Sequence, residues 1–444
     1  MTFDNLNDAS TWLEEFTNYE KHPPSTVEEY SLDRMNLMLG AFGNPQNSFK
    51  SVHIAGSKGK GSTAAFTAAV LSEAGFRTGL YTSPHITTYR ERIKADGREF
   101  DDADYLVSIN HIAERLENDA ALAPAKEGAG PTTFELLTLL GFLMFREAGC
   151  AWAVIETGLG GRLDATNTLL PEIAVITPVE LEHTDILGKT LEKIAREKAG
   201  IMKAGRPACI GHQKPEAEAV LIQRGAELGI PVSFLARETA SISSRSEGAG
   251  TAADIRFHSY PPIRTPLGML GDFQAENAAL AALSLYLLFP DSMNGIPTGE
   301  RICRGLSLAR LPGRMELVSK DPVIILDGAH TPVSADRLSR AFVSMYGGEG
   351  VLLFGCVSDK DAGAMANILA GCFRHIVIST PGTYKKSVPE QVFEIYRKLK
   401  PDTRFEPDPA QALSAALALA GGRLPVLVAG SFYMAAEIRK LLVS

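Results

Sequence analysis

A glycine-rich segment near the N-terminus has the residue types of a phosphate-binding loop. It lies between a short apolar run and a helix-forming run, and it consists of Gly56, Ser57, Lys58, Gly59, Lys60, Gly61 and Ser62. Glycine lets successive backbone N–H groups point at one anion, and the following helix contributes its positive N-terminal end. The Lys60 amine can pair with phosphate charge, and the Ser62 hydroxyl can bind a metal ion. We therefore expect a nucleoside triphosphate here, the alternative being a turn that only joins strand to helix.

Oxygen and nitrogen ligands follow three other apolar runs in the first half of the chain. Ser83, Glu156 and His183 each come after a separate run, and in open parallel sheets the carboxyl ends of the strands meet at the ligand site. Mg²⁺ prefers hard oxygen ligands and phosphate, which Ser62, Ser83 and Glu156 would supply, with His183 as a less usual ligand. A second ion could share Glu156. Taken singly, these residues could be a turn serine, a cap and a hydrogen-bonded loop histidine; together they predict a magnesium site.

A lysine lies on the apolar face of an amphipathic helix predicted at 190–203. Lys198 comes four residues after Ile194 and three after Ala195, so its amine is directed to the interior, where loss of hydration favours the neutral form. A neutral lysine can add carbon dioxide and become a carbamate, an anion that can orient a metal ion. The alternatives are an amine that reaches the surface or pairs with a carboxylate.

Short aliphatic runs alternate with longer helix-like segments along the chain. The expected strands are 52–55, 79–82, 151–155, 173–177, 208–211, 323–326, 351–354, 375–379 and 424–429. This rhythm predicts an α/β protein whose mostly parallel sheets are covered by helices. A stretch at 290–313 that contains proline and glycine separates the two series and is the expected link. The stretches 120–131 and 241–253 are rich in small residues, and we expect exposed loops there.

Length and composition limit the possible functions. A chain of 444 residues exceeds the usual size of a single core, so two domains are expected. The formal net charge of −8 argues against a nucleic-acid or anionic-membrane partner. Five scattered cysteines without a Cys-x-x-Cys pair predict neither disulfides nor a zinc site. The N-terminus does not look like a signal peptide and the longest apolar stretch, 136–145, is too short to span a bilayer, so the expected location is the cytoplasm.

The motifs together resemble the folate branch of the Mur-ligase superfamily, the dihydrofolate synthases and folylpolyglutamate synthases. The similarity covers nearly the whole chain. The matching blocks are GSKGKGS at 56–62, TSPH at 82–85, ETGLGGRLDATN at 156–167, HTDILG at 183–188, EKAGI at 197–201, QAEN at 274–277, LPGR at 311–314, DGAH at 327–330 and DKD at 359–361. The resemblance implies a P-loop ATPase domain with a mostly parallel sheet at 1–311, which also binds the pterin. A smaller Rossmann-like domain at 312–444 would bind glutamate and complete the ATP site.

The reaction implied by this resemblance uses ATP in three steps. A pteroate or folate carboxylate attacks the γ-phosphate, an acyl phosphate forms, and the amine of L-glutamate displaces phosphate. The implied cofactors are ATP and two Mg²⁺ ions, with room for a monovalent cation. The implied partners are these small molecules alone, and we expect a monomer.

Residue roles carry over from the family where the motifs match. Besides the phosphate loop, the implied ATP contacts are Asn277, Arg314 and Asp327. The family's magnesium ligands match Ser62, Ser83, Glu156 and His183, its carbamylated lysine matches Lys198, and its catalytic groups match Lys60, Lys198 and His330. The pterin-binding segments match Asp33, Arg34, Thr133, Phe134, Glu135, Arg162 and Asp164.

The chain departs from the family pattern at a few positions. Lys58 and Thr331 stand where asparagine is usual, and Glu182 stands where aspartate is common. Gly61 between Lys60 and Ser62 differs from the common Gly-x-x-x-x-Gly-Lys-Ser/Thr loop but agrees with this family.

Three other functions would require different features of the chain. A cell-wall ligase that joins an amino acid to a UDP-sugar peptide would carry a further domain before the loop, whereas only 55 residues precede Gly56. A non-ligase P-loop ATPase would not need the block at 327–330. A binding protein without activity would have no need of Lys60 or Glu156. The sequence leaves open whether dihydropteroate, reduced folate or both are the acceptors.

Overall fold

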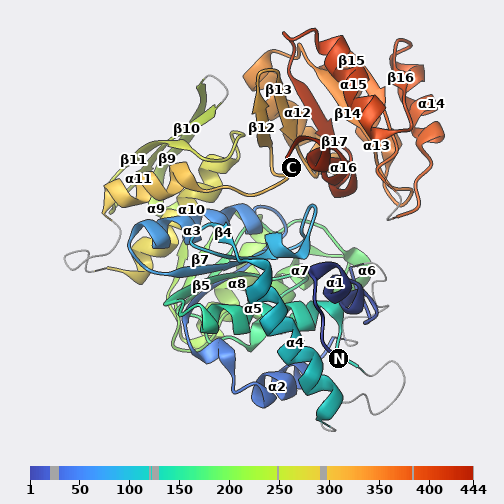
Figure 1. Ribbon diagram of the computed structural model, residues 1–444. Helices are drawn as coiled ribbons and strands as arrows, with labels where there is room; N and C mark the ends of the chain where they lie inside the picture. Colours follow the sequence, from blue (N-terminus) through green and yellow to red (C-terminus); the bar gives the residue numbers. More distant parts are fainter. Residues whose placement is uncertain are drawn as a thin grey trace.

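The computed structural model describes residues 1–20, 30–119, 122, 130–247, 250–290, 298–382 and 385–443. Within these residues the chain forms two α/β units and a small antiparallel sheet (Figure 1). The second α/β unit, drawn from orange to red, lies above the first, and the small sheet lies beside both. The predicted α/β fold with a mostly parallel first sheet is confirmed.

The first unit is built on an eight-stranded sheet in the order β4-β3-β2-β5-β1-β6-β7-β8. The strands are β1 (Lys50–Ala55), β2 (Thr78–Tyr81), β3 (Ile93–Ala95), β4 (Arg98–Glu99), β5 (Trp152–Glu156), β6 (Ile173–Ile176), β7 (Ala208–Ile210) and β8 (Val232–Phe234). Strands β2, β5, β1, β6, β7 and β8 run parallel, whereas β3 and β4 form an antiparallel edge. The central strands are buried on both faces because helices cover both sides.

The helices of the first unit divide between the two faces of this sheet. They are α1 (Leu6–Glu14), α2 (Leu32–Ala41), α3 (Lys60–Glu73), α4 (Asp102–Asn118), α5 (Thr133–Glu147), α6 (Thr184–Leu187), α7 (Leu191–Ala199), α8 (Pro215–Leu228), α9 (Leu235–Glu238), α10 (Gln274–Leu288) and α11 (Gly299–Leu308). Helix α3 packs with α10 and α11 in one core, whereas α5 packs with α1, α2 and α4 in another. The helix predicted at 190–203 is α7, which ends four residues earlier.

The stretch 241–253 was expected to be a loop, and this expectation is wrong. It belongs to a three-stranded antiparallel sheet formed by β9 (Thr239–Glu247), β10 (Gly250–Phe257) and β11 (Ile263–Leu267). Small residues have little strand propensity, but Ala253 and Ile255 of β10 are buried in the core shared with α10 and α11. Packing therefore overrides composition. Most of the other expected loop, 120–131, lies outside the described residues.

The second unit is built on a six-stranded sheet in the order β12-β13-β17-β14-β15-β16. Its elements are β12 (Glu316–Lys320), β13 (Val323–Leu326), α12 (Pro332–Tyr346), β14 (Val351–Phe354), α13 (Ala362–Leu369), β15 (His375–Ile378), α14 (Pro389–Leu399), β16 (Arg404–Phe405), α15 (Pro409–Ala420), β17 (Val426–Ala429) and α16 (Phe432–Leu442). The expected link at 290–313 is too long, because it includes α11, which packs on α3 of the first unit. None of the helices in the described parts of the chain is both long and apolar enough to cross a membrane.

Candidate active site

Residues from both α/β units line one cavity of about 1030 Å³. The first unit contributes residues at the carboxyl ends of β1, β2, β5 and β6, which are neighbours in the parallel part of its sheet. The second unit contributes residues that follow β13, β14 and β17. Strand exits of two parallel sheets therefore face each other across a single space, the arrangement in which open α/β sheets bind ligands.

The phosphate loop connects β1 to α3 and needs glycine at two positions. Gly56 and Gly59 have φ of +147° and +87°, and a Cβ on Gly59 would lie 2.3 Å from Asn277 Oδ1. The N–H groups of Ser57 and Lys58 donate to Pro178 O at 2.9 and 3.4 Å, which ties the loop to the segment after β6. The N–H groups of the first turn of α3 have no acceptor within the helix, so they are the ones that could bind an anion.

The segment after β6 connects this loop to the second unit. Ser57 donates through Oγ to Glu180 O at 3.1 Å and accepts the Glu180 N–H at 3.0 Å. The carboxylate of Glu180 forms an ion pair with Arg337 on α12. The phosphate loop, the 178–183 segment and the second unit are therefore joined by one continuous set of contacts.

The four predicted magnesium ligands, Ser62, Ser83, Glu156 and His183, all line the cavity. Glu156 is 3% exposed, and its Oε2 accepts the Ser83 N–H at 3.1 Å. Burial raises the pKa of this carboxyl, while Lys60 and the Ser83 N–H oppose the rise. A buried acid with so few donors fits a cation bound beside it. Among the described residues no three His, Cys, Asp or Glu side chains cluster at metal-binding range, so such an ion would depend on serine hydroxyls and phosphate oxygens.

The side chain of Lys198 extends from α7 to the backbone of the phosphate loop. Its Nζ donates to Gly56 O at 2.7 Å and to Glu182 Oε1 at 2.8 Å. Burial lowers the pKa of this amine to about 8, although Glu182 opposes the shift. The unmodified lysine is thus paired with a carboxylate, which is one of the alternatives that the sequence left open. Its amine loses a proton much more easily than the amine of an exposed lysine.

The nucleotide residues predicted in the first turn of α10 and in the second unit also reach the cavity. Asp327 accepts the N–H groups of Met315 and Ala329 at 2.8 Å each. Arg314 lies over the ring of Phe432, 4.4 Å from its centroid. His330 Nδ1 is 2.8 Å from Gly328 O, which requires the proton on Nδ1 and leaves Nε2 with a lone pair. Burial lowers the pKa of His330 to about 4, so this imidazole is neutral near pH 7.

The predicted pterin residues divide into two groups. Arg34, Phe134, Glu135 and Asp164 line the cavity. Thr133 is buried away from it and donates to Leu13 O, whereas Asp33 is exposed at the start of α2 and Arg162 turns outward to pair with Glu197. The structure therefore does not bring these three side chains to the cavity wall.

Glu135 already has two donors in the structure. Its Oε2 accepts the Thr132 N–H at 2.7 Å and the Arg34 Nε–H at 2.8 Å. The first contact is half of a capping box at the start of α5. Glu135 therefore shapes the wall and orients Arg34.

A buried ion pair at the cavity was not predicted from the sequence. Arg92 is 1% exposed and donates through both terminal nitrogens to Glu20, at 2.8 and 2.7 Å, and through Nε to His85 Nδ1 at 2.9 Å. All three residues line the cavity. A charged residue directly before the apolar start of β3 was the available signal, but its partner lies 72 residues away along the chain.

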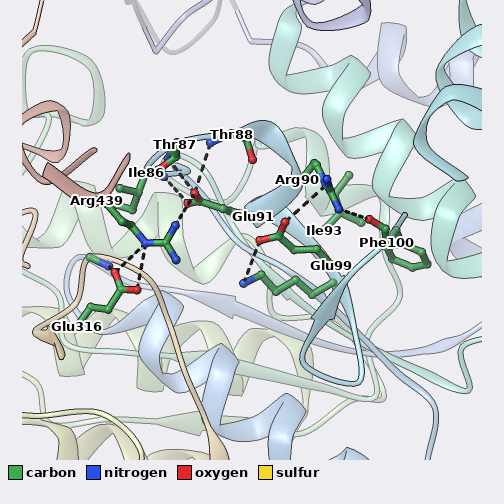
Figure 2. A network of polar contacts seen from close by, with 12 residues as sticks. Ile86, Thr87, Thr88, Arg90, Glu91, Ile93, Glu99, Phe100, Glu316 and Arg439 are labelled. Carbon is green, nitrogen blue, oxygen red and sulfur yellow. Dashed lines mark hydrogen bonds and ion pairs between the residues drawn. The ribbon is translucent and has the colours of Figure 1, made fainter. Parts of the chain in front are cut away.

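A polar network beside the cavity joins the two units (Figure 2). Glu91, which follows β2, accepts the N–H groups of Ile86 at 2.7 Å and Thr87 at 2.9 Å. Arg439 on α16 lies with its Nη1 3.8 Å from Glu91 Oε1 and donates through Nε to Glu316 Oε1 at 3.1 Å. The loop after β2 is thereby tied to the second sheet.

We expect Arg439→Met to lower the free energy of unfolding by about 1–2 kcal/mol, because Glu316 loses a charged donor in a half-buried site. Urea unfolding followed by circular dichroism would measure the change. The control is Arg374→Met, which removes an exposed pair with Glu349 and should cost less than about 0.5 kcal/mol. Equal losses in the two variants would contradict a role for the network.

Two family profiles match the chain. The profile of the Mur ligase middle domain matches residues 54–285, and that of the Mur ligase glutamate ligase domain matches residues 313–432. A folylpolyglutamate synthase from Lacticaseibacillus casei is 32% identical over 410 residues, covering 92% of this chain and 94% of that protein. A dihydrofolate synthase/folylpolyglutamate synthase from Bacillus subtilis (strain 168) is 31% identical, covering 99% of this chain and all of that protein.

Solved structures agree with these relatives. Mycobacterium tuberculosis folylpolyglutamate synthase complexed with ADP superposes with a TM-score of 0.87 at 27% identity, covering 99% of this chain and 98% of that one. An FPGS–AMPPCP–folate complex has a TM-score of 0.80 at 29% identity, covering 99% and 100%. These matches favour the folate branch over a cell-wall ligase or a non-ligase ATPase. The chain is a ligase that belongs to the folylpolyglutamate synthase/dihydrofolate synthase family of the Mur ligases.

Proposed function

We propose that this protein uses ATP to join L-glutamate to dihydropteroate, to reduced folate, or to both, through an acyl phosphate. The observation that carries the proposal is that one cavity is lined by the phosphate loop, the buried Glu156 and the second-unit residues Asp327 and His330. The relatives named for both activities support it.

In this mechanism the first turn of α3 and Lys60 bind the β- and γ-phosphates. Asn277, Arg314 and Asp327 bind the rest of the nucleotide. One oxygen of the acceptor carboxylate attacks the γ-phosphorus and ADP leaves. The glutamate amine, after losing a proton, then attacks the acyl carbon and phosphate leaves. The lone pair on His330 Nε2 is available to accept that proton.

We place two Mg²⁺ ions at Ser62, Ser83, Glu156 and His183, where they would neutralise charge on the transferring phosphoryl group. A carbamate on Lys198 is part of this proposal: the neutral amine would add carbon dioxide and release one proton, and the resulting anion would help to hold a metal ion. A monovalent cation would bind in the same site.

The two domains have different roles in this proposal. Residues 1–311 bind ATP and the pterin, and residues 312–444 bind glutamate. The protein acts as a cytoplasmic monomer without nucleic-acid or membrane partners.

Phosphate release from ATP, Mg²⁺ and L-glutamate tests the proposed reaction. We expect release to depend on the acceptor, dihydropteroate or tetrahydrofolate, because the acceptor carboxylate is the attacking group. Product analysis by mass spectrometry would then show which acceptor gains glutamate. Phosphate release that is the same with and without either acceptor would contradict the function.

A further inference from the structure

A fully buried histidine lies behind the phosphate loop, and the mechanism above makes no use of it. His53 is the fourth residue of β1, between Ile155 of β5 and Ala174 of β6 in the neighbouring strands. Its neighbours Val52 and Ile54 face the core with α3, so strand alternation directs His53 to the opposite face. Burying an imidazole in the centre of a sheet is costly unless its nitrogens find partners.

The partner of His53 connects it to the cavity wall. His53 Nε2 is 2.8 Å from Thr166 Oγ1, and Thr166 Oγ1 is 2.5 Å from Asp164 Oδ1. Asp164 lines the cavity, whereas His53 and Thr166 do not. The three side chains therefore form a line that runs from the middle of the sheet to the place where a ligand would bind.

The residues at the two ends, Asp164 and His53, determine which group donates in each of these hydrogen bonds. Thr166 Oγ1 donates to Asp164 Oδ1, because a carboxylate oxygen can only accept. His53 Nδ1 is buried and has no hydrogen-bond partner in the described structure. A bare lone pair there costs less than an unpaired N–H, so the proton lies on Nε2. Burial lowers the pKa of His53 to about 3, which keeps the ring neutral. His53 therefore donates to Thr166, and Thr166 donates to Asp164.

Both carboxylate oxygens of Asp164 are held by backbone N–H groups. Its Oδ1 also accepts the Thr166 N–H at 3.0 Å, and its Oδ2 accepts the Leu159 N–H at 2.9 Å. The nearby ring of Phe134 lies against Gly158, where a Cβ would come within 2.5 Å of the ring. A fixed carboxylate beside an aromatic ring suits a flat heterocycle with adjacent N–H donors.

We propose that His53 is a positioning residue: by occupying the acceptor side of the Thr166 hydroxyl, it commits the hydroxyl proton to Asp164 and holds that carboxylate as an acceptor for the N–H groups of the pterin ring. This inference rests on the proposed function, because it assigns the pterin to the Asp164 side of the cavity. In the proposed function the reacting phosphates bind at the 56–62 loop and the pterin binds at Asp164, so we expect His53 to affect acceptor binding and to leave nucleotide binding unchanged.

Two pairs of variants test the line. His53→Gln keeps an N–H donor near the place of Nε2, and its amide oxygen takes the place of the unpartnered Nδ1, whereas His53→Met has similar length and no donor. Thr166→Ser keeps the hydroxyl and Thr166→Val removes it. We expect the KM and the calorimetric Kd for dihydropteroate to rise about tenfold in the Met and Val variants and by less than about threefold in the Gln and Ser variants. The KM for ATP should stay within about twofold in all four.

The double variant His53→Met/Thr166→Val should bind dihydropteroate no worse than Thr166→Val alone, because each change interrupts the same chain of hydrogen bonds to Asp164. The control is Thr168→Val, which removes a hydroxyl that donates to Ala165 O in the 3-10 helix Ala165–Thr168, the helix that also contains Thr166, and should leave the Kd unchanged. If His53→Met fails to fold by near-ultraviolet circular dichroism, the Thr166 pair decides alone. Equal effects of Gln and Met, equal effects of Ser and Val, or a matching rise in the KM for ATP would overturn the positioning role. If phosphate release by the unmodified protein did not depend on the acceptor, that result would instead contradict the proposed function.

Discussion

Replacing Lys60 with alanine should lower kcat about a hundredfold to a thousandfold. The side chain lies at the start of α3, beside the buried Glu156 and within the cavity. In the proposed reaction its charge acts most strongly on the oxygens of the transferring phosphoryl group, so the loss should appear mainly in kcat. Steady-state phosphate release at saturating ATP and acceptor would measure it.

The matched control for this charge removal is Lys50→Ala. Lys50 is at the other end of β1, where its amine lies over the Trp152 ring at 5.7 Å from the centroid. We expect kcat to change less than about twofold in that variant. A Lys60→Ala enzyme that keeps more than about half of the original kcat would show that the loop binds phosphate without using this amine in the transition state.

Replacing Lys198 with alanine should remove most activity, and short carboxylates such as formate or acetate should restore part of it. The expected loss is about a hundredfold or more, because the substitution removes the anion proposed to orient a metal ion and leaves Glu182 without its partner. Added carboxylate can occupy the space of the carbamate, so kcat should rise with its concentration. Incubation with ¹³C-labelled bicarbonate and carbon-13 NMR would detect the carbamate directly in the unmodified enzyme.

Lys198→Arg separates the carbamate from the ion pair. Arginine keeps a cation for Glu182 but cannot be carbamylated, because its guanidinium stays protonated. We expect this variant to be inactive and not to respond to carboxylates. Full activity in the arginine variant would show that the pair with Glu182 is the only role of Lys198, and unchanged activity in the alanine variant would exclude both roles.

The sequence predicted most of the parallel strands to within about two residues at each end, because strands buried on both faces are continuous apolar runs. It missed β8 and β16, the short parallel strands at the edges of the two sheets. It failed for β9 and β10, whose serines and alanines form strands only because the hairpin packs on α10 and α11. Propensity describes a residue by itself, whereas this sheet depends on what covers it.

The convergence of Ser62, Ser83, Glu156 and His183 on one cavity follows from the sheet topology, which the sequence already indicated. Side-chain direction could not be predicted in the same way. Arg162 lies in a matching motif but turns outward, because Glu197 on α7 offers it a partner 3.0 Å away. The pattern Thr132-x-x-Glu135 is itself a capping-box signature, so one role of Glu135 could have been identified from the sequence.

The contacts made by the 178–183 segment have a thermodynamic consequence. One end of it accepts hydrogen bonds from the phosphate loop, and Glu180 in its middle is paired with Arg337 of the second unit. The same segment carries Glu182, the partner of Lys198. A rotation of the second unit that breaks or strains the Glu180 pair must therefore alter the loop that holds the nucleotide. Linkage makes such coupling reciprocal: whatever factor domain closure adds to the affinity for ATP, bound ATP adds to the equilibrium constant for closure.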